Sequence, residues 1–227
     1  MSAPRQTPAL RVLPRGRHAA PREVVAESQR ERLLVAMAAA TAAKGYANIA
    51  VADVIDGAGV SRRSFYEHFT NKEECFLAAY DAGVTGLLDA IEEAGAAAGP
   101  GLLGPARAST EAYLGILADN PAFARTFLIE VLGAGPAALA RRDAVHQRFA
   151  EQISTSYAAI AAAAGGLPEL PPYVFRAAVG AIHELVTDQL LREGAESLPA
   201  LLGPILEIEA RLIGTGPRAG AVSAPGR

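Results

Sequence analysis

The sequence predicts an all-α protein, with a three-helix N-terminal helix-turn-helix domain and a helical C-terminal domain, about nine helices in all. Apolar residues recur at helical spacing along most of the chain. No segment shows the strict apolar–polar alternation of a half-buried strand. Glycine and proline divide the body into segments, at Asn120-Pro121, Gly133–Pro136, Gly165–Pro172 and Gly194–Pro199.

Composition places the chain among ordinary globular proteins. It has 227 residues, of which 51% are hydrophobic and 20% charged. Its one cysteine, Cys75, rules out an internal disulfide, so we expect a reducing, cytoplasmic setting. Spacing with Phe76 and Ala79 predicts that Cys75 is an inert core thiol. We expect neither a secretory signal nor a membrane span, because no apolar run is long enough.

Charge is divided unevenly along the chain. Residues 1–80 carry 11 Lys and Arg against 8 Asp and Glu, whereas residues 81–227 carry 10 against 16. The net charge of −3 argues against indiscriminate binding to nucleic acid. The uneven division is typical of a protein whose N-terminal end alone meets phosphate, although such a division also arises by chance.

Breaks in the helical pattern predict the domain boundaries. Residues 1–26 are interpreted as a flexible basic arm, which either reaches a minor groove or has no function. Residues 27–80 form the N-terminal domain, with the helix-turn-helix at about 50–69, and residues 81–213 form the body. Residues 214–227 are predicted to be a disordered tail. The expected body helices are 105–119, 121–132, 136–164, 172–193 and 198–213.

Local signals set the expected ends of the N-terminal helices. A capping box at Ser28–Glu31 predicts the start of the first helix, and Gly45 its end. The second helix is expected at 51–58. Gly59 permits a sharp turn, and Ser61 is a good N-cap for a third helix at 62–69. Asn71 with Glu74 is predicted to cap a long fourth helix.

Three cations are predicted to lie in the first turns of helices: Arg62, Arg63 and Lys72. The helix dipole is positive there and disfavours each cation by roughly 0.3–1 kcal/mol. An external anion would compensate them, and DNA phosphates and guanine edges are the obvious candidates. In a helix-turn-helix, the N-terminal residues of the second helix meet base edges in the major groove. Solvated surface charge is the alternative interpretation.

The same stretch resembles a known family. The matching segments, in order, are Gly45-Tyr46, Val51–Ile55, Ala58–Ser61, Phe65–Phe69 and Asn71–Glu74. Over residues 30–80 their order and spacing are similar to the DNA-binding domain of the TetR family. The resemblance implies a dimeric regulator that binds a palindromic operator on double-stranded DNA. It also implies an effector cavity in the body, and family habit favours repression.

The resemblance assigns roles by position. It implies that Arg62, Arg63 and Ser64 face bases or nearby phosphates, and that Tyr66, His68 and Lys72 hold the DNA backbone. Phe65 and Phe69 would point into the core. Ser64 could equally be a spacer, and Tyr66 and His68 could be packing residues. The family usually has Thr or Ser before the second helix, where this chain has Ile49-Ala50, so Asn48 is a candidate substitute.

In the body, the resemblance implies that aromatic and histidine side chains line a ligand pocket, although each could be plain core. Gly180 within a helix predicts a close helix crossing at the dimer interface, for which the helices at 172–193 and 198–213 are the candidates. Gly203-Pro204 predicts a kink or a late helix start. The pocket candidates are Tyr113, Phe123, Phe127, His146, Phe149 and His183.

Other function classes fit the sequence less well. Catalytic signatures are missing: no metal-ligand spacing, no nucleophile elbow and no phosphate-binding glycine loop. We therefore expect no enzyme activity, metal or cofactor. A helical interaction module without DNA binding remains an alternative, against which Arg62, Arg63 and Lys72 argue. The effector and the operator sequence cannot be read from the sequence.

Overall fold

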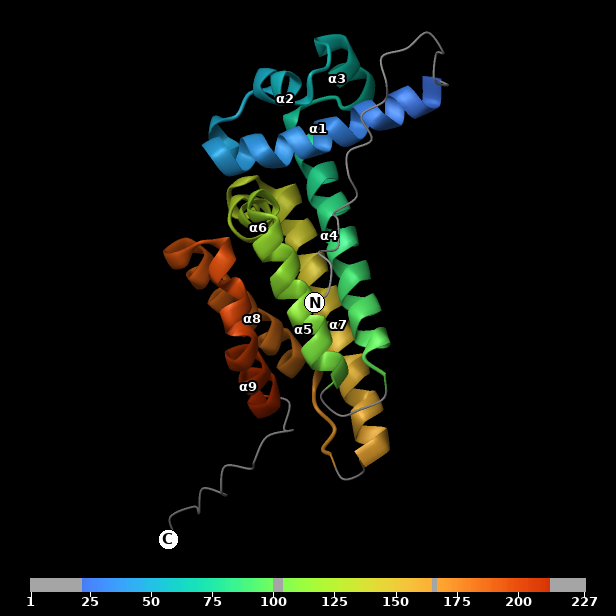
Figure 1. Ribbon diagram of the computed structural model, residues 1–227, viewed down its shortest axis with the longest axis vertical. Coiled ribbons are helices and arrows are strands. Elements are labelled where there is room, and N and C mark those ends of the chain that lie inside the picture. Colours follow the sequence, from blue (N-terminus) through green and yellow to red (C-terminus); the bar gives the residue numbers. More distant parts are fainter. Residues whose placement is uncertain (1–21, 100–103, 165–166, 213–227) are drawn as a thin grey trace, which may run out of the picture.

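The computed structural model describes residues 22–99, 104–164 and 167–212. Within these ranges every regular element is a helix, which confirms the predicted all-α class (Figure 1). The elements are α1 (Arg22–Lys44), η1 (Tyr46–Asn48), α2 (Val51–Ala58), α3 (Arg62–His68), α4 (Lys72–Ala97), α5 (Gly104–Asp119), α6 (Pro121–Leu128), η2 (Glu130–Gly133), α7 (Pro136–Ala164), α8 (Pro172–Glu193), η3 (Ala195–Leu201) and α9 (Leu202–Leu212), where η marks a short 3-10 helix.

The long helix α4 joins the two parts of the molecule. Helix α1 crosses the end of α4, and α2 and α3 lie on the side of α1 that faces away from the body (Figure 1). In the body, α5 and α7 run beside α4, α8 packs on α7 and α9 on α5, and the short α6 lies next to α1 (Figure 1). None of the helices in the described ranges is long and apolar enough to cross a membrane.

The start of α1 differs from the prediction. The helix begins at Arg22, so residues 22–26 of the predicted arm are helical and the predicted capping box lies inside the helix. No proline follows Pro21 before the end of α1, and nothing therefore stops the helix from extending beyond Ser28. The rest of the predicted arm, residues 1–21, and the predicted tail lie outside the described residues.

The other N-terminal signals are confirmed. Gly45 and Gly59 have φ angles of 76° and 61°, a region that favours glycine. The Ser61 side chain caps α3 by accepting from the amide of Ser64 at 3.0 Å. At α4, Asn71 accepts from the Glu74 amide, and the Glu74 carboxylate accepts in return from the Thr70 amide. These caps give α2, α3 and α4 fixed ends.

The body helices follow the predicted segments, with two differences at their ends. Helix α6 stops at Leu128 and continues as η2. At the C-terminal end, η3 leads into α9 at Leu202, so Pro204 sits in the first turn of the α-helix. The first turn tolerates proline because its amides have no partner within the helix. The predicted late start at Gly203-Pro204 is confirmed.

One apolar core runs through both parts of the molecule and includes Phe65, Phe76 and Tyr80. Cys75 is buried in it, and burial raises the pKa of its thiol to about 12, as an inert core thiol requires. Where α4 crosses α6, a Cβ added at Gly83 would lie 2.3 Å from the Phe123 ring. Any larger residue at position 83 would therefore displace the Phe123 ring from α4.

Replacing Gly83 by alanine should destabilise this crossing. The partly buried Phe123 ring would have to move, at a cost of roughly 1–3 kcal/mol. Gly86 lies on the exposed side of the same helix, where an added Cβ meets nothing within 4 Å. The matched variant Gly86→Ala should gain about 0.4–1 kcal/mol from the stiffer unfolded chain. Urea unfolding checks the pair, and equal stability of the two variants would contradict the crossing.

Candidate nucleic-acid interface and ligand cavity

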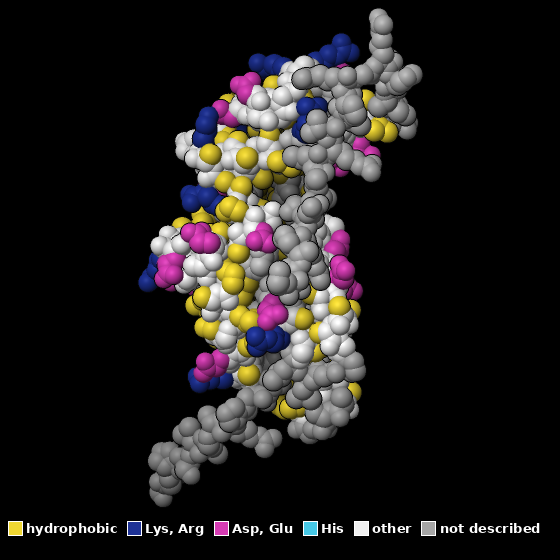
Figure 2. Space-filling model, in the orientation of Figure 1, with side chains coloured by type: hydrophobic (Ala, Val, Ile, Leu, Met, Phe, Trp, Pro, Cys, Tyr) yellow, Lys and Arg dark blue, Asp and Glu magenta, His cyan; other side chains and the backbone are white. Residues whose placement is uncertain are grey.

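The exposed face of α3 carries the first group of predicted site residues. Arg62, Arg63 and Tyr66 are exposed, whereas Phe65 and Phe69 are buried in the core as predicted. We call residues 59–69 the reading head. Figure 2 shows lysine and arginine side chains at the end of the molecule formed by α2 and α3. This end thus presents cations and one aromatic ring to the solvent.

Both arginines have neighbours on their own helix. Arg63 Nε donates to Glu67 at 2.9 Å, while its side chain stays 89% exposed. The guanidinium carbon of Arg62 lies 5.8 Å from the centre of the Tyr66 ring, within cation–π range. Exposed pairs of this kind contribute about 0–1 kcal/mol, so either arginine can exchange its partner for a phosphate or a base.

The remaining residues of α3 are less available. Ser64 is partly buried, and its hydroxyl lies 3.0 Å from that of Ser61, so it belongs to the helix cap. His68 is also partly buried, with its ring 6.3 Å from that of Phe69. Both positions combine a packing role with a place on the face of the reading head.

Lys72 does not need an external anion, contrary to the sequence argument. Its ammonium donates to the carbonyls of Tyr46 and Ile49, each at 3.0 Å. It also lies 4.4 Å from the centre of the Tyr46 ring. Two of its three N–H groups are therefore used within the protein, and Lys72 holds the turn before α2 against the start of α4. Sequence reasoning could not find these partners, 23 and 26 residues away.

The turn before α2 is stabilised without a Ser or Thr cap. Asp53 accepts from the amide of Ala50 at 2.8 Å and pairs with Lys44 at 2.6 Å. Both contacts hold the pKa of the Asp53 carboxyl below its usual range. Asn48 donates to the Lys44 carbonyl and does not cap α2, so its part as a substitute is left to the phosphate contact, which stays a prediction.

Arg32 is a supporting residue that sequence reasoning missed. Its guanidinium donates to the carbonyls of Ala58 at 3.0 Å and Gly59 at 3.4 Å. These carbonyls end α2, where the helix dipole favours a cation. Arg32 thereby fixes the turn between α2 and α3 to α1. Its place one turn after Ser28 on α1 gives no signal of this role.

A cavity of about 590 Å³ lies within the body, between α4, α5, α7, α8 and α9. Its volume is in the range of small-molecule sites, about 300–1,000 Å³. Tyr113, Phe127 and Phe149 supply aromatic walls, and His146 and His183 line it too. Five of the six predicted pocket residues are thus brought together. Phe123 is not among them, because its ring packs over Gly83 at the α4–α6 crossing.

The two histidines touch each other, with ring centres 4.7 Å apart. Burial is the main cause that lowers the pKa of His146 to about 4 and that of His183 to about 3. Both imidazoles are neutral at pH 7. The described residues contain no group of three or more His, Cys, Asp or Glu placed to hold a metal ion.

A line of aromatic rings connects the cavity to the Tyr46 turn, which precedes α2. Successive ring centres lie 4.7 to 6.5 Å apart, within the range of aromatic packing. At one end Lys72 covers Tyr46, and at the other end two histidines line the cavity. This ring column consists of Tyr46, Phe76, Tyr80, Phe127, His183 and His146.

Glu130 forms a second connection between the two parts. Its carboxylate accepts from the Tyr46 amide at 2.9 Å and pairs with Arg125 at 3.2 Å. Thr126 adds a bond to the Ala38 carbonyl of α1 at 3.4 Å. The body therefore holds the N-terminal domain through α6 and η2, on the same Tyr46 turn that Lys72 holds from the other side.

Comparison with known proteins agrees with this geometry. Residues 33–79 match the family described as bacterial regulatory proteins, tetR family. No curated protein matches the sequence. The fold is similar to the fatty acid degradation regulator FadR from Bacillus halodurans, with a TM-score of 0.72, 16% identity, and coverage of 85% of this chain and 96% of that one.

Two further structures have the same fold. FadR from Bacillus subtilis, solved in complex with stearoyl-CoA, gives a TM-score of 0.71 at 16% identity, over 81% of this chain and 97% of that one. A tetR-family regulatory protein from Rhodococcus gives 0.63 at 21% identity, over 82% and 96%. Residues 33–79 of the chain thus form a DNA-binding domain of the tetR family, carried on a body with the fold of these regulators.

Proposed function

We propose that this DNA-binding regulator is a ligand-responsive repressor that binds a palindromic operator as a homodimer in the cytoplasm. The observation that carries the proposal is the reading head, where Arg62, Arg63 and Tyr66 are exposed on a helix with a fixed start. A rigid element of this kind holds its side chains in place for base edges and phosphates. Ser64 and His68 are proposed as further contacts on the same face.

Lys72 has a different role in this proposal. It positions the Tyr46 turn, and its third N–H group remains for a DNA phosphate. Arg62 and Arg63 are free to contact DNA directly, because their present partners are exposed and weak. The resemblance-based role of Lys72 thus becomes secondary to its role inside the domain.

Ligand response requires the cavity to bias the position of the reading head. A ligand against His183 would press on Phe127, which stacks on Tyr80. The ring column then continues to the Tyr46 turn, where Lys72 and Glu130 both bind. A ligand that fits only one arrangement of these rings would shift the population towards it and weaken DNA binding. The similar FadR structure was solved in complex with stearoyl-CoA, which supports the proposal that the cavity of this chain binds a small-molecule ligand.

The outward face of α8 supports the homodimer. Tyr173, Gly180 and Leu191 recur at helical spacing and are exposed, Tyr173 at 72% and Leu191 at 60%. A Cβ added at Gly180 would meet nothing within 4 Å, so packing within one chain does not require this glycine. We propose that a second copy crosses α8 there, in a two-fold arrangement that matches a palindromic operator.

Replacing both reading-head arginines should abolish specific DNA binding. Each arginine is expected to contribute about 1–3 kcal/mol, through a base or a phosphate. The DNA is a duplex selected by the wild-type chain from a random library, and gel shifts over a salt series measure the affinity. Arg62→Ala with Arg63→Ala should bind weakly, with a smaller salt slope. The control Arg107→Ala removes another exposed arginine, paired with Glu111 on α5, and should bind normally.

A wild-type chain that selects no duplex, or binds without salt dependence, would refute the regulator assignment. Equal binding by the doubly substituted variant and by Arg107→Ala would instead move the interface away from α3. Both outcomes come from the same titrations.

Lys72→Met should lower the stability of the protein and not only its DNA affinity. The substitution leaves the carbonyls of Tyr46 and Ile49 without their donor, which is expected to cost about 1–3 kcal/mol. Lys44→Met, which removes an exposed ion pair to Asp53, should change the unfolding free energy by less than about 1 kcal/mol. Urea unfolding without DNA gives both values. If Lys72→Met leaves the unfolding free energy unchanged, the hydrogen bonds of Lys72 do not stabilise the turn, and its role would be phosphate binding alone.

Gly180→Arg should prevent dimerisation, because a long charged side chain would enter the proposed crossing of two α8 helices. The matched control is Gly86→Arg, also an exposed glycine of a long helix with open space above it. Sedimentation velocity should show a dimer for the wild type and the control, and a monomer for Gly180→Arg. A dimeric Gly180→Arg, or a monomeric wild type, would contradict the proposed interface.

A further inference from the structure

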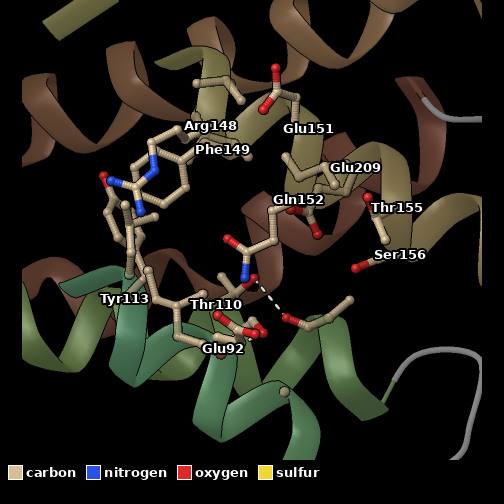
Figure 3. A pocket seen from close by; sticks show the side chains of 18 of the residues that line it. Glu92, Thr110, Tyr113, Arg148, Phe149, Glu151, Gln152, Thr155, Ser156 and Glu209 are labelled. Atoms are coloured by element: carbon tan, nitrogen blue, oxygen red, sulfur yellow. Dashed lines mark hydrogen bonds between the residues drawn. The ribbon is translucent and has the colours of Figure 1, made fainter. Parts of the chain in front are cut away.

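Charged side chains are distributed unevenly around the cavity. Three carboxyl groups line it, those of Glu92, Glu151 and Glu209, against one guanidinium, that of Arg148. Figure 3 shows Arg148 beside Phe149 and Tyr113, and Glu209 near Gln152 on another part of the wall. Glu92 and Glu151 are exposed, so the acidic part of the wall lies where the cavity opens to solvent.

Glu209 lacks a compensating cation. In the described part of the chain no hydrogen bond or ion pair involves its carboxyl, and burial alone raises its pKa to about 7. Glu207, two residues earlier on α9, is exposed and pairs with Arg211. A partly buried carboxylate without a partner is costly. The cavity wall at Glu209 therefore lacks a cation to balance the carboxylate charge.

The two histidines of the cavity wall are uncharged, and one of them carries an unsatisfied polar atom. His146 and His183 are each only 8% exposed and both line the cavity. Nε2 of His146 is buried and has no hydrogen-bond partner among the described residues. Because both imidazoles are uncharged at pH 7, they offer polar contacts but add no positive charge to the wall; a cation close to both is Arg142, whose charge helps to lower the pKa of both histidines and which does not itself line the cavity.

We propose that the cavity binds a lipophilic organic cation, with its positively charged group against Glu209 and its apolar body along the aromatic walls towards His146. This inference rests on the proposed ligand-responsive function and names the chemical class of the ligand. The apolar body would contact apolar side chains that also line the cavity, among them Ile91, Phe127 and Ile182. A polar atom on the ligand would satisfy His146.

The same charges argue against the ligand of the similar FadR structure. A coenzyme A thioester carries several negative phosphate charges. Its head group would lie against three carboxyls with one arginine to offset them, and like charges brought together oppose binding. The shared fold therefore accommodates a different ligand class, because the fold does not determine the charge of the cavity wall.

The test measures binding to the full-length chain directly, by isothermal titration calorimetry. The probes share one alkyl chain: decyltrimethylammonium, decanoate and neutral decanol, with stearoyl-CoA as a fourth. Wild type should bind the cation at least about tenfold more tightly than decanoate. Glu209→Gln should lose about tenfold in affinity for the cation and keep its affinity for decanol, which shows that the cavity is intact. The matched control Glu207→Gln should behave as wild type.

The pH dependence of the affinity for the cation is a second test, and it needs only the wild-type chain. The cation prefers ionised Glu209, so its affinity should rise between about pH 6 and pH 8 and the binding of decanol should not. The other groups facing the cavity are Glu92 on α4, Tyr113 on α5, His146, Arg148, Glu151 and Tyr157 on α7, and His183 on α8. The two histidines are neutral throughout this range, and Tyr113 stays protonated because burial raises the pKa of its phenol.

Tighter binding of decanoate or stearoyl-CoA, no preference between cation and anion, or no binding of any probe would overturn the inference. An unchanged preference in Glu209→Gln would overturn it as well. If that variant does not fold, the pH dependence of the wild type decides. None of these results touches DNA binding, whereas a chain that binds the cation but selects no operator would refute the proposed function alone.

Discussion

The turn at Tyr46 holds the N-terminal domain and the body together. Its amide donates to Glu130 of η2, its carbonyl accepts from Lys72 of α4, and its ring packs on Phe76 at 4.7 Å. The two hydrogen bonds to charged groups are worth roughly 1.5–3 kcal/mol each. Because the turn leads directly into α2, these bonds also set the position of the reading head. The backbone amide and carbonyl of Tyr46 thus link the reading head to the helices of the body.

The ring column extends this connection to the cavity. Each ring lies within packing distance of the next, from Tyr46 on the turn to His146 on the cavity wall. Close packing transmits displacement, because a buried ring cannot move without moving its neighbours. Glycine at position 83 lets Phe123 pack closely against α4 beside this column. The geometry gives a ligand a contiguous physical route to the DNA-binding end, and a shift between two arrangements is what would make it a switch.

Local sequence signals predicted most of the fold. Gly45, Gly59, Ser61 and Asn71 each act through groups within four residues, so their roles follow from spacing alone. The start of α1 was placed wrongly because a capping box can also occur inside a helix. Contacts between segments far apart in the chain could not be predicted from the sequence. Glu130 meets the Tyr46 amide across 84 residues, and nothing near either position indicates the pair.

The candidate sites show the same difference between what the sequence indicates and what only the fold brings together. The family resemblance located the exposed arginines, and five of the six pocket candidates do line the cavity. It did not indicate the partners of Lys72 within the protein, and the DNA contact of this lysine stays a prediction; Phe123 packs at a helix crossing and does not line the cavity. Glu209 was missed because α9 looks like an ordinary amphipathic helix in sequence, and only the fold turns its carboxyl towards the cavity.

Hydrogen exchange of the chain, free and bound to its selected duplex, tests the central claim most directly. The account predicts slower exchange in residues 59–72, where DNA would bind, and also at the Tyr46 amide and in η2 (Glu130–Gly133), which DNA does not touch. The second effect would report that the reading head and the body are held through the same turn. Protection confined to other helices, or protection of the reading head with no change at Tyr46 and η2, would contradict the account.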